Sequence, residues 1–109
     1  MKLAIIGSRS INLDLDEYVP NNVTEIVTGG AKGVDLSARD FAMIHGIKLT
    51  EFLPEYNLYG KCATLIRNKK IAEYADEAIA IWDGESKGTL HTINCFKKLK
   101  KKVTVHIIK

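Results

Sequence analysis

The sequence predicts an α/β protein whose single domain, residues 1–109, is built on a parallel sheet of about five strands. Short apolar segments rich in β-branched residues alternate with segments in which apolar residues recur every three or four positions. Glycines follow the first two apolar segments, where a strand would end and a helix would begin. Because right-handed crossovers leave few arrangements, we expect a Rossmann-like, doubly wound sheet with strand order 3-2-1-4-5.

Five short apolar segments are predicted to be the strands of this sheet. The first, "KLAIIG", ends in a glycine, and the second, "TEIVTGG", is rich in β-branched residues that favour strands. The fourth, "EAIAIW", is followed by a polar, glycine-bearing loop. The predicted strands span residues 2–7, 24–30, 47–52, 77–82 and 103–108.

Four helices are predicted between these strands. The first is a short candidate that Asn12 or Asp14 would cap and Pro20 would end. The second begins with a helical stripe of apolar residues at Val34, and Gly46 is placed to end it. The predicted helices span residues 12–19, 34–45, 61–75 and 89–101, and residues 53–60 are expected to form an irregular loop.

The net charge of +3 depends on one local stretch of lysines. "KKLKKK", residues 97–102, holds five lysines, so the rest of the chain is net acidic. We interpret the stretch as the solvated last turn of a helix, where lysines also favour the negative end of the helix dipole. Proteins that bind nucleic acid usually have a broader basic face.

The composition argues against several other classes of protein. No apolar run approaches the ~18 residues of a membrane span, and no signal-peptide cleavage site follows the first strand. We therefore expect a cytoplasmic protein with no membrane partner. Cys62, Cys95 and the three histidines lack metal-type spacing, so no metal site is predicted. A domain of this size buries only a modest share of its surface, which favours a homo-oligomer such as a dimer.

Three strand ends are predicted to meet at one edge of the sheet, where ligands bind in folds of this class. Arg9 offers a planar cationic fork suited to phosphate, and Lys87 offers a point charge. The glycines of "TGGAKGVD" let backbone N–H groups approach an anion at a helix start. We therefore predict a phosphate-bearing ligand. The predicted ligand-binding residues are Gly7, Ser8, Arg9, Gly29, Gly30, Ala31, Gly33, Asp35, Asn68, Gly84, Ser86, Lys87, Gly88 and Thr89.

Several of these side chains have two interpretations. Asp35 either caps a helix or accepts a ribose hydroxyl. Trp82 either stacks on a base or fills the core, and Tyr56 and Tyr59 offer a wall for a base. His91 is either an acid or base near neutral pH or an inert residue of a first helical turn. Neither GxGxxG nor GxxxxGK[ST] is present, which argues against a nucleoside triphosphatase.

The motifs in combination resemble the SLOG superfamily. "GSR" follows the first strand, "GGAKGVDLSA" the second, and "YGKCATLIRNKKIAEYADEAIAIWDGESKGT" precedes and opens the last helix. The superfamily joins DNA-processing Rossmann domains with the cytokinin-activating phosphoribohydrolases known as Lonely Guy proteins. The small bacterial and phage branch of this group is the nearest in pattern. The resemblance implies a Rossmann-like fold and a nucleotide or nucleotide-derived ligand, related to NAD or ADP-ribose.

The resemblance to the phosphoribohydrolases raises the question of catalysis. Arg67 stands at the position of their arginine, but the glutamates after their "GGxGT" have no counterpart here. An oxocarbenium-like transition state needs a nearby carboxylate. Asp83, Glu85 and Asp35 are the candidates, and Asp83 at the end of the fourth strand is the best placed. Arg67 and Asp83 are therefore the predicted catalytic pair.

Three functions follow from these residues. The first is a sensor or effector domain that binds a nucleotide or an NAD- or ADP-ribose-like derivative; beyond such a ligand, the residues assign no cofactor. The second is a nucleotide N-glycosidase of the phosphoribohydrolase type. The third is binding of single-stranded nucleic acid through the lysine run, which the DNA-processing relatives suggest. Whether any reaction is catalysed stays open at this point.

Overall fold

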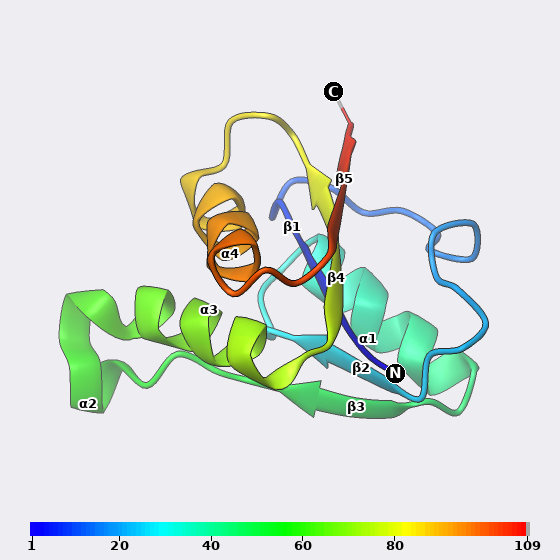
Figure 1. The fold of residues 1–109 in the computed structure, drawn as a ribbon, viewed down its shortest axis with the longest axis horizontal. Helices are drawn as coiled ribbons and strands as arrows, with labels where there is room; N and C mark the ends of the chain where they lie inside the picture. The colour runs from blue at the N-terminus through cyan, green and yellow to red at the C-terminus, as the bar shows by residue number, and fades with distance from the viewer. Residues whose placement is uncertain (109) are drawn as a thin grey trace.

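Five parallel strands form one sheet in the order β3-β2-β1-β4-β5, which confirms the predicted fold class and strand order (Figure 1). The structure, a computed structural model, describes residues 1–108. β1 lies in the middle and pairs with β2 on one side and β4 on the other. The strands are β1 (Lys2–Gly7), β2 (Glu25–Thr28), β3 (Lys48–Glu51), β4 (Glu77–Trp82) and β5 (Val103–Ile107).

Helices cover both faces of the sheet (Figure 1). One face is covered by α1 (Val34–Ile44), and the other by α3 (Ala63–Tyr74) and α4 (Lys87–Lys98). These helices confirm three of the four predicted helical segments, although α4 begins two residues earlier than expected. No helix within residues 1–108 is long and apolar enough to cross a membrane.

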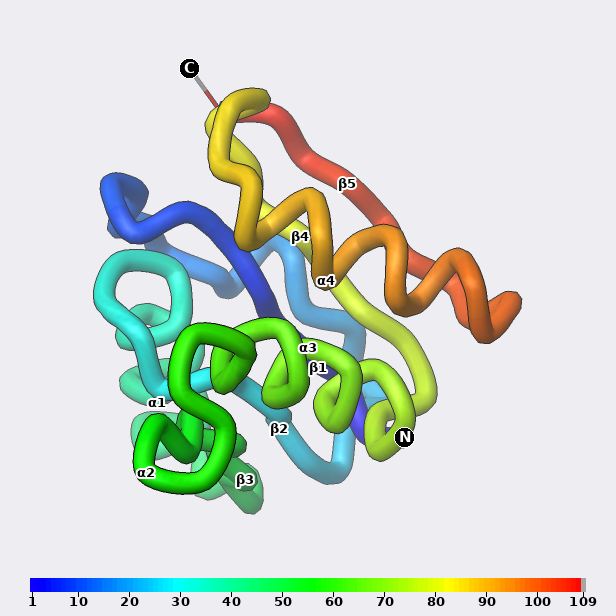
Figure 2. The backbone as a smooth tube through the Cα atoms, turned by 90° about the vertical axis from the view of Figure 1, so that its left-hand side faces the viewer, coloured from blue at the N-terminus to red at the C-terminus, as the bar shows by residue number. Residues whose placement is uncertain are grey.

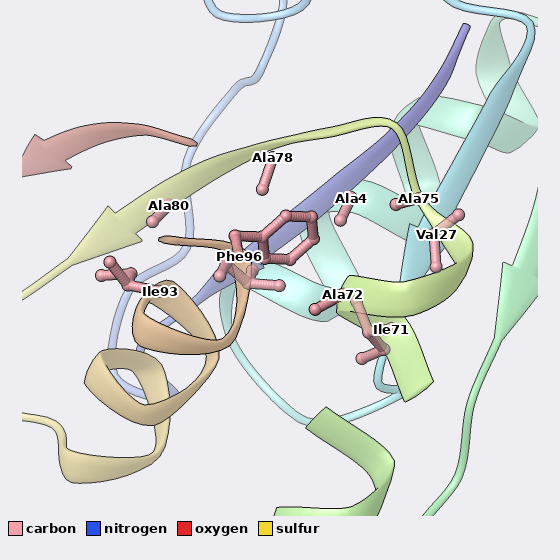
Figure 3. Close-up of a cluster of buried hydrophobic side chains, with 10 residues drawn as sticks. Ala4, Val27, Ile71, Ala72, Ala75, Ala78, Ala80, Ile93 and Phe96 are labelled. Carbon is pink, nitrogen blue, oxygen red and sulfur yellow. The ribbon is translucent and has the colours of Figure 1, made fainter. Parts of the chain in front are cut away.

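The core on the α3 and α4 side is built around one aromatic ring. Phe96 projects from α4 toward Ala4 of β1 and Ala78 of β4 and is fully buried (Figure 3). The small alanines on the strands leave the volume that this ring fills, since protein interiors are close-packed. On the other face, Val34 and Ala38 of α1 pack against the large side chains of the same strands. Alternate residues of each strand therefore point into the two cores, one on each face of the sheet.

The predicted helix at residues 12–19 is wrong. This connection is an extended loop with a turn at residues 16–19, and it covers the α1 face of the sheet with Leu15, which is 2% exposed. The side chain of Asp14 accepts a hydrogen bond from the Asp16 N–H at 2.9 Å, a local turn that competes with a helix. Leu13 and Leu15, both packed in this core, are two residues apart, the spacing of extended chain.

The predicted loop at residues 53–60 is partly helical. It contains α2 (Tyr56–Tyr59), one short turn that continues into a 3₁₀ turn (Gly60–Cys62) before α3 begins. None of the α2 residues is buried. A four-residue turn has too few positions to show helical periodicity, and the sequence therefore gave no signal for it.

The lysine run contains a specific contact that holds α3 in place. Lys101 Nζ donates to the carbonyl oxygens of Ala72, Glu73 and Ala75 at 2.7–2.9 Å, at the C-terminal end of α3. A cation is stabilising there because the last helical carbonyls lack partners and carry the negative end of the dipole. The run lies where β4 begins, since the Ala78 N–H donates to the Lys102 carbonyl at 3.0 Å.

The variant Lys101→Met tests this contact. It keeps the aliphatic stem but removes the ammonium group, and we expect unfolding free energy to fall by about 1–3 kcal/mol. The matched control is Lys102→Met, an exposed lysine of the same run, for which we expect a change within about 0.5 kcal/mol. Urea denaturation of both variants measures the difference. Equal effects would show that the run acts only through its total charge.

Candidate functional site

A cavity of about 280 Å³ lies at the carboxyl ends of β1 and β2, between the sheet edge and the helices α3 and α4. β1 is the strand at which the order of the sheet reverses, and this edge is where doubly wound proteins bind ligands. The cavity is lined by Ile6, Gly7, Arg9, Gly29, Ala31, Asp35, Thr64, Leu65, Arg67, Asn68, Ile71, Ser86, Gly88, Thr89 and Thr92.

The structure brings together most of the residues predicted for the site. Those that line the cavity are Gly7, Arg9, Gly29, Ala31, Asp35, Arg67, Asn68, Ser86, Gly88 and Thr89. Those that do not are Ser8, Gly30, Gly33, Asp83, Gly84 and Lys87. Sequence reasoning missed Thr64 and Thr92, two polar side chains of α3 and α4. Helical spacing could have indicated both. Thr64 lies one helical turn before Arg67, and Thr92 lies one turn after Gly88, so each shares a helix face with a predicted site residue.

Ser8 connects three elements rather than facing the cavity. It is 1% exposed, its N–H donates to the Ile81 carbonyl of β4 at 3.0 Å, and its hydroxyl accepts the Asp83 N–H at 3.0 Å. Its carbonyl accepts the Val34 N–H at the start of α1 at 3.4 Å. The N-terminal end of α1 is therefore directed at a backbone carbonyl.

The glycines of "GGAKG" are explained by close packing within the protein. A Cβ at Gly33 would lie 2.4–2.5 Å from the carbonyl oxygens of Arg9 and Ser8, and its φ of +71° is one that side chains rarely adopt. A Cβ at Gly29 would lie within 2.4 Å of Arg67 Nη1. Glycines are needed at this corner because the loop after β1 and the Arg67 side chain already occupy the space that a Cβ would fill.

Arg67 is held by backbone and side-chain acceptors. Its Nη1 donates to the Gly29 carbonyl at 2.6 Å and to the Phe52 carbonyl at 3.4 Å, and its Nε donates to Asn68 Oδ1 at 2.8 Å. Burial lowers the pKa of Arg67, and the negative charge of Asp35 opposes that effect. The guanidinium thus fastens α3 to the ends of β2 and β3 while part of it lines the cavity.

Asp35 is the carboxylate of the cavity and is 7% exposed. Burial raises its pKa, against the lowering effects of the Ala31 N–H and of Arg67. Oδ2 accepts the Ala31 N–H at 3.1 Å, so the side chain shapes the glycine corner while lining the cavity. The predicted cap is wrong, because Gly33 occupies the N-cap position of α1 and no side chain caps this helix; the carboxylate bonds the turn before it instead.

The N-terminal end of α4 faces the cavity. Ser86 caps the helix, and its Oγ accepts the N–H of Thr89 at 3.4 Å and the hydroxyl of Thr89 at 3.2 Å. Within residues 1–108, no acceptor bonds the backbone N–H groups of Lys87 and Gly88. Two donors at the positive end of a twelve-residue helix therefore stay available, one of them on the cavity-lining Gly88.

Asp83 and Arg67 are not brought together. The Asp83 carboxylate accepts the Glu85 and Ser86 N–H groups at 2.8 Å, and hydrogen bonds from Ser86 and Glu85 lower its pKa. Asp83 lines a second cavity, beside Trp82 and Glu85. It therefore shapes the turn before α4, and of the three candidate carboxylates only Asp35 lines the cavity beside Arg67.

The aromatic residues and histidines lie mostly outside the cavity. Tyr56 and Tyr59 are exposed on α2, and Trp82 donates its indole N–H to the Ser86 carbonyl at 3.0 Å. His45 lies 3.3 Å from the Asp16 carboxylate, whereas His91 reaches the Asn68 amide at 3.2 Å. No group of three or more His, Cys, Asp or Glu side chains within residues 1–108 is arranged to hold a metal ion.

Comparison with known proteins identifies the fold. No family model and no curated protein matches the chain. The X-ray structure of DNA processing protein A (DprA) from Streptococcus pneumoniae matches with a TM-score of 0.76 and 20% sequence identity. The match covers 95% of this chain and 49% of that one, so the chain spans about half the length of the protein it resembles. The two share the Rossmann-like α/β fold, in agreement with the fold expected from the SLOG resemblance.

The variant Gly33→Ala tests whether the glycine corner is structural. We expect it to lose about 3 kcal/mol or more of unfolding free energy, because a Cβ meets two backbone carbonyls at positive φ. The matched control is Gly88→Ala, whose Cβ meets nothing within 4 Å, and which should leave stability unchanged or raise it by up to about 1 kcal/mol. Thermal and urea denaturation measure both. A fully stable Gly33→Ala protein would contradict this account.

Proposed function

We propose that the chain binds a nucleotide or a nucleotide-derived ligand in the cavity at the sheet edge and acts as a sensor or effector domain. One observation carries the proposal. Arg9 is exposed, lines the cavity and has no carboxylate within 4 Å in residues 1–108, and the open N-terminal end of α4 lines the same cavity. A free guanidinium beside unpaired backbone N–H groups favours a phosphate.

The remaining lining residues suit the rest of such a ligand. Asp35, Asn68 and Thr64 offer polar atoms for ribose hydroxyls, and Ile6 and Leu65 offer apolar surface for a base. The volume of about 280 Å³ lies just below the range of small-molecule pockets, which span about 300–1,000 Å³. It therefore favours a mononucleotide, or one half of a dinucleotide such as NAD or ADP-ribose.

Binding is a better-supported function than catalysis. A phosphoribohydrolase mechanism requires an arginine and a carboxylate at one anomeric carbon, and Asp83 lines a different cavity from Arg67. Asp35 is the carboxylate that remains for such a role. Chromatography of every ligand that binds distinguishes the two functions, since release of free base, abolished in Asp35→Asn, would make the protein a hydrolase.

Binding of single-stranded DNA is the second candidate function. It is favoured by the name of the structural neighbour, DNA processing protein A, and by the exposed lysines of residues 97–102. These lysines lie at the C-terminal end of α4 and just beyond it, whereas the cavity is lined by residues 86–92 at the start of this helix. Figure 2 shows the length of α4. Affinity for a poly-dT oligonucleotide that falls steeply with salt and disappears when the exposed lysines become glutamine would support it.

The variant Arg9→Ala tests the proposed phosphate contact. We expect AMP or ADP-ribose, whichever binds, to lose about 10- to 100-fold in affinity, because one charge-assisted hydrogen bond is removed. Adenosine, which has no phosphate, should show no such loss. The matched control is Arg39→Ala, an exposed arginine of α1 that does not line the cavity. Calorimetric titration measures each dissociation constant, and equal affinities for the two variants would contradict the contact.

A further inference from the structure

A chain of hydrogen bonds runs from the cavity to the groove between α3 and α4. Arg67 Nε donates to Asn68 Oδ1 at 2.8 Å, and Asn68 Nδ2 lies 3.2 Å from His91 Nδ1. Asn68 is 5% exposed, so its amide has little access to water and depends on these two partners. Arg67 and Asn68 line the cavity, whereas His91 lines the groove.

The chemistry of the three groups fixes the direction of every bond. A guanidinium only donates, so the amide oxygen of Asn68 must face Arg67. The amide nitrogen of Asn68 then faces His91 and also only donates. Nδ1 of His91 must therefore accept, and the neutral ring carries its proton on Nε2.

We propose that neutral His91 is a positioning residue for the cavity: it fixes the Asn68 amide, which holds the Arg67 guanidinium in the cavity wall. A proton on Nδ1 would place two donors face to face. The amide then turns to offer its oxygen to His91, and Arg67 Nε loses its acceptor. The arrangement seen here is thus kept while the His91 ring is neutral and lost once the ring carries a second proton. The effect on ligand affinity rests on the proposed nucleotide binding.

The charged and titratable groups around His91 come from both helices. Lys69 and Glu73 of α3 and Cys95 and Lys98 of α4 line the same groove. Cys95 Sγ lies 3.9 and 4.0 Å from the two ring nitrogens, and burial raises the pKa of this thiol. Lysine, glutamate and cysteine side chains ordinarily titrate outside pH 5–8, where histidine changes charge. On the far side of Arg67, Asp35, Tyr56 and Arg9 are the further groups whose charges act on the guanidinium.

NMR of the full chain tests the proposal without any ligand. Long-range ¹H–¹⁵N spectra should give His91 the Nε2–H form at pH 7.5. The Arg67 Nε–H resonance should shift between pH 8 and 5 together with the His91 ring. In His91→Asn, whose amide oxygen occupies the place of Nδ1 and does not titrate, the Arg67 resonance should stay at its high-pH position. His45→Asn, an exposed histidine at the end of α1, is the matched control and should behave like the unchanged protein.

Ligand affinity gives the second readout. With AMP as the probe, the dissociation constant of the unchanged protein should rise about tenfold more between pH 7.5 and 5.5 than that of His91→Asn. An Nδ1–H form of neutral His91, or an Arg67 resonance that ignores the His91 titration, would overturn the proposal. An intact NMR response without AMP binding would keep the positioning role and reject AMP as a ligand. AMP binding with identical pH profiles would retain the nucleotide site and reject His91's role in it.

Discussion

The corner after β1 is the constraint on which the rest of the site depends. Ser8 sits there, fully buried, and bonds backbone groups of β4, of the turn before α4 and of α1. The segments that meet there are far apart in the sequence, and glycines stand at Gly7 and Gly33 because a Cβ at either position would collide with atoms of a neighbouring segment. A Cβ on Gly7 would lie 2.4 Å from the Ile81 carbonyl oxygen. The cavity is the space left over beside this junction.

The two helix starts beside this junction differ in what they offer to an anion. The first N–H of α1 is taken by the Ser8 carbonyl, and Asp35 in its first turn adds a negative charge, so an anion gains little there. α4 begins with Ser86 as its cap and no acid in its first turn. The favourable field for a phosphate is therefore concentrated at α4 and at Arg9. The motif "GGAKG" before α1 has more glycines than "GESKG" before α4, yet it is the less suited of the two to bind an anion.

The alternation of apolar segments was sufficient to predict the sheet and its strand order, and the candidate cavity lies at the sheet edge where a site was expected. The alternation could not distinguish the residues that line the cavity from those that only pack against other parts of the chain. Gly33 and Ser8 were predicted to bind a ligand, yet the atoms they meet belong to the chain itself, and a spacing rule says nothing of which atoms fill a corner. The Asn68–His91 pair was equally hidden, because its members are 23 residues apart and meet only where α3 packs on α4.

Three cations of this chain illustrate why residue type alone does not define a binding site. Lys101 bonds three carbonyl oxygens at the end of α3, and Arg67 bonds two carbonyls and an amide, so both are committed to the protein. Arg9 has neither kind of partner within residues 1–108 and faces the cavity. A cation that is already satisfied gains little from a new anion, because the ligand replaces bonds instead of adding them. In the nucleotide complex proposed above, the phosphate contact therefore falls to Arg9, the arginine that the fold leaves free, and Arg67 shapes the wall beside it.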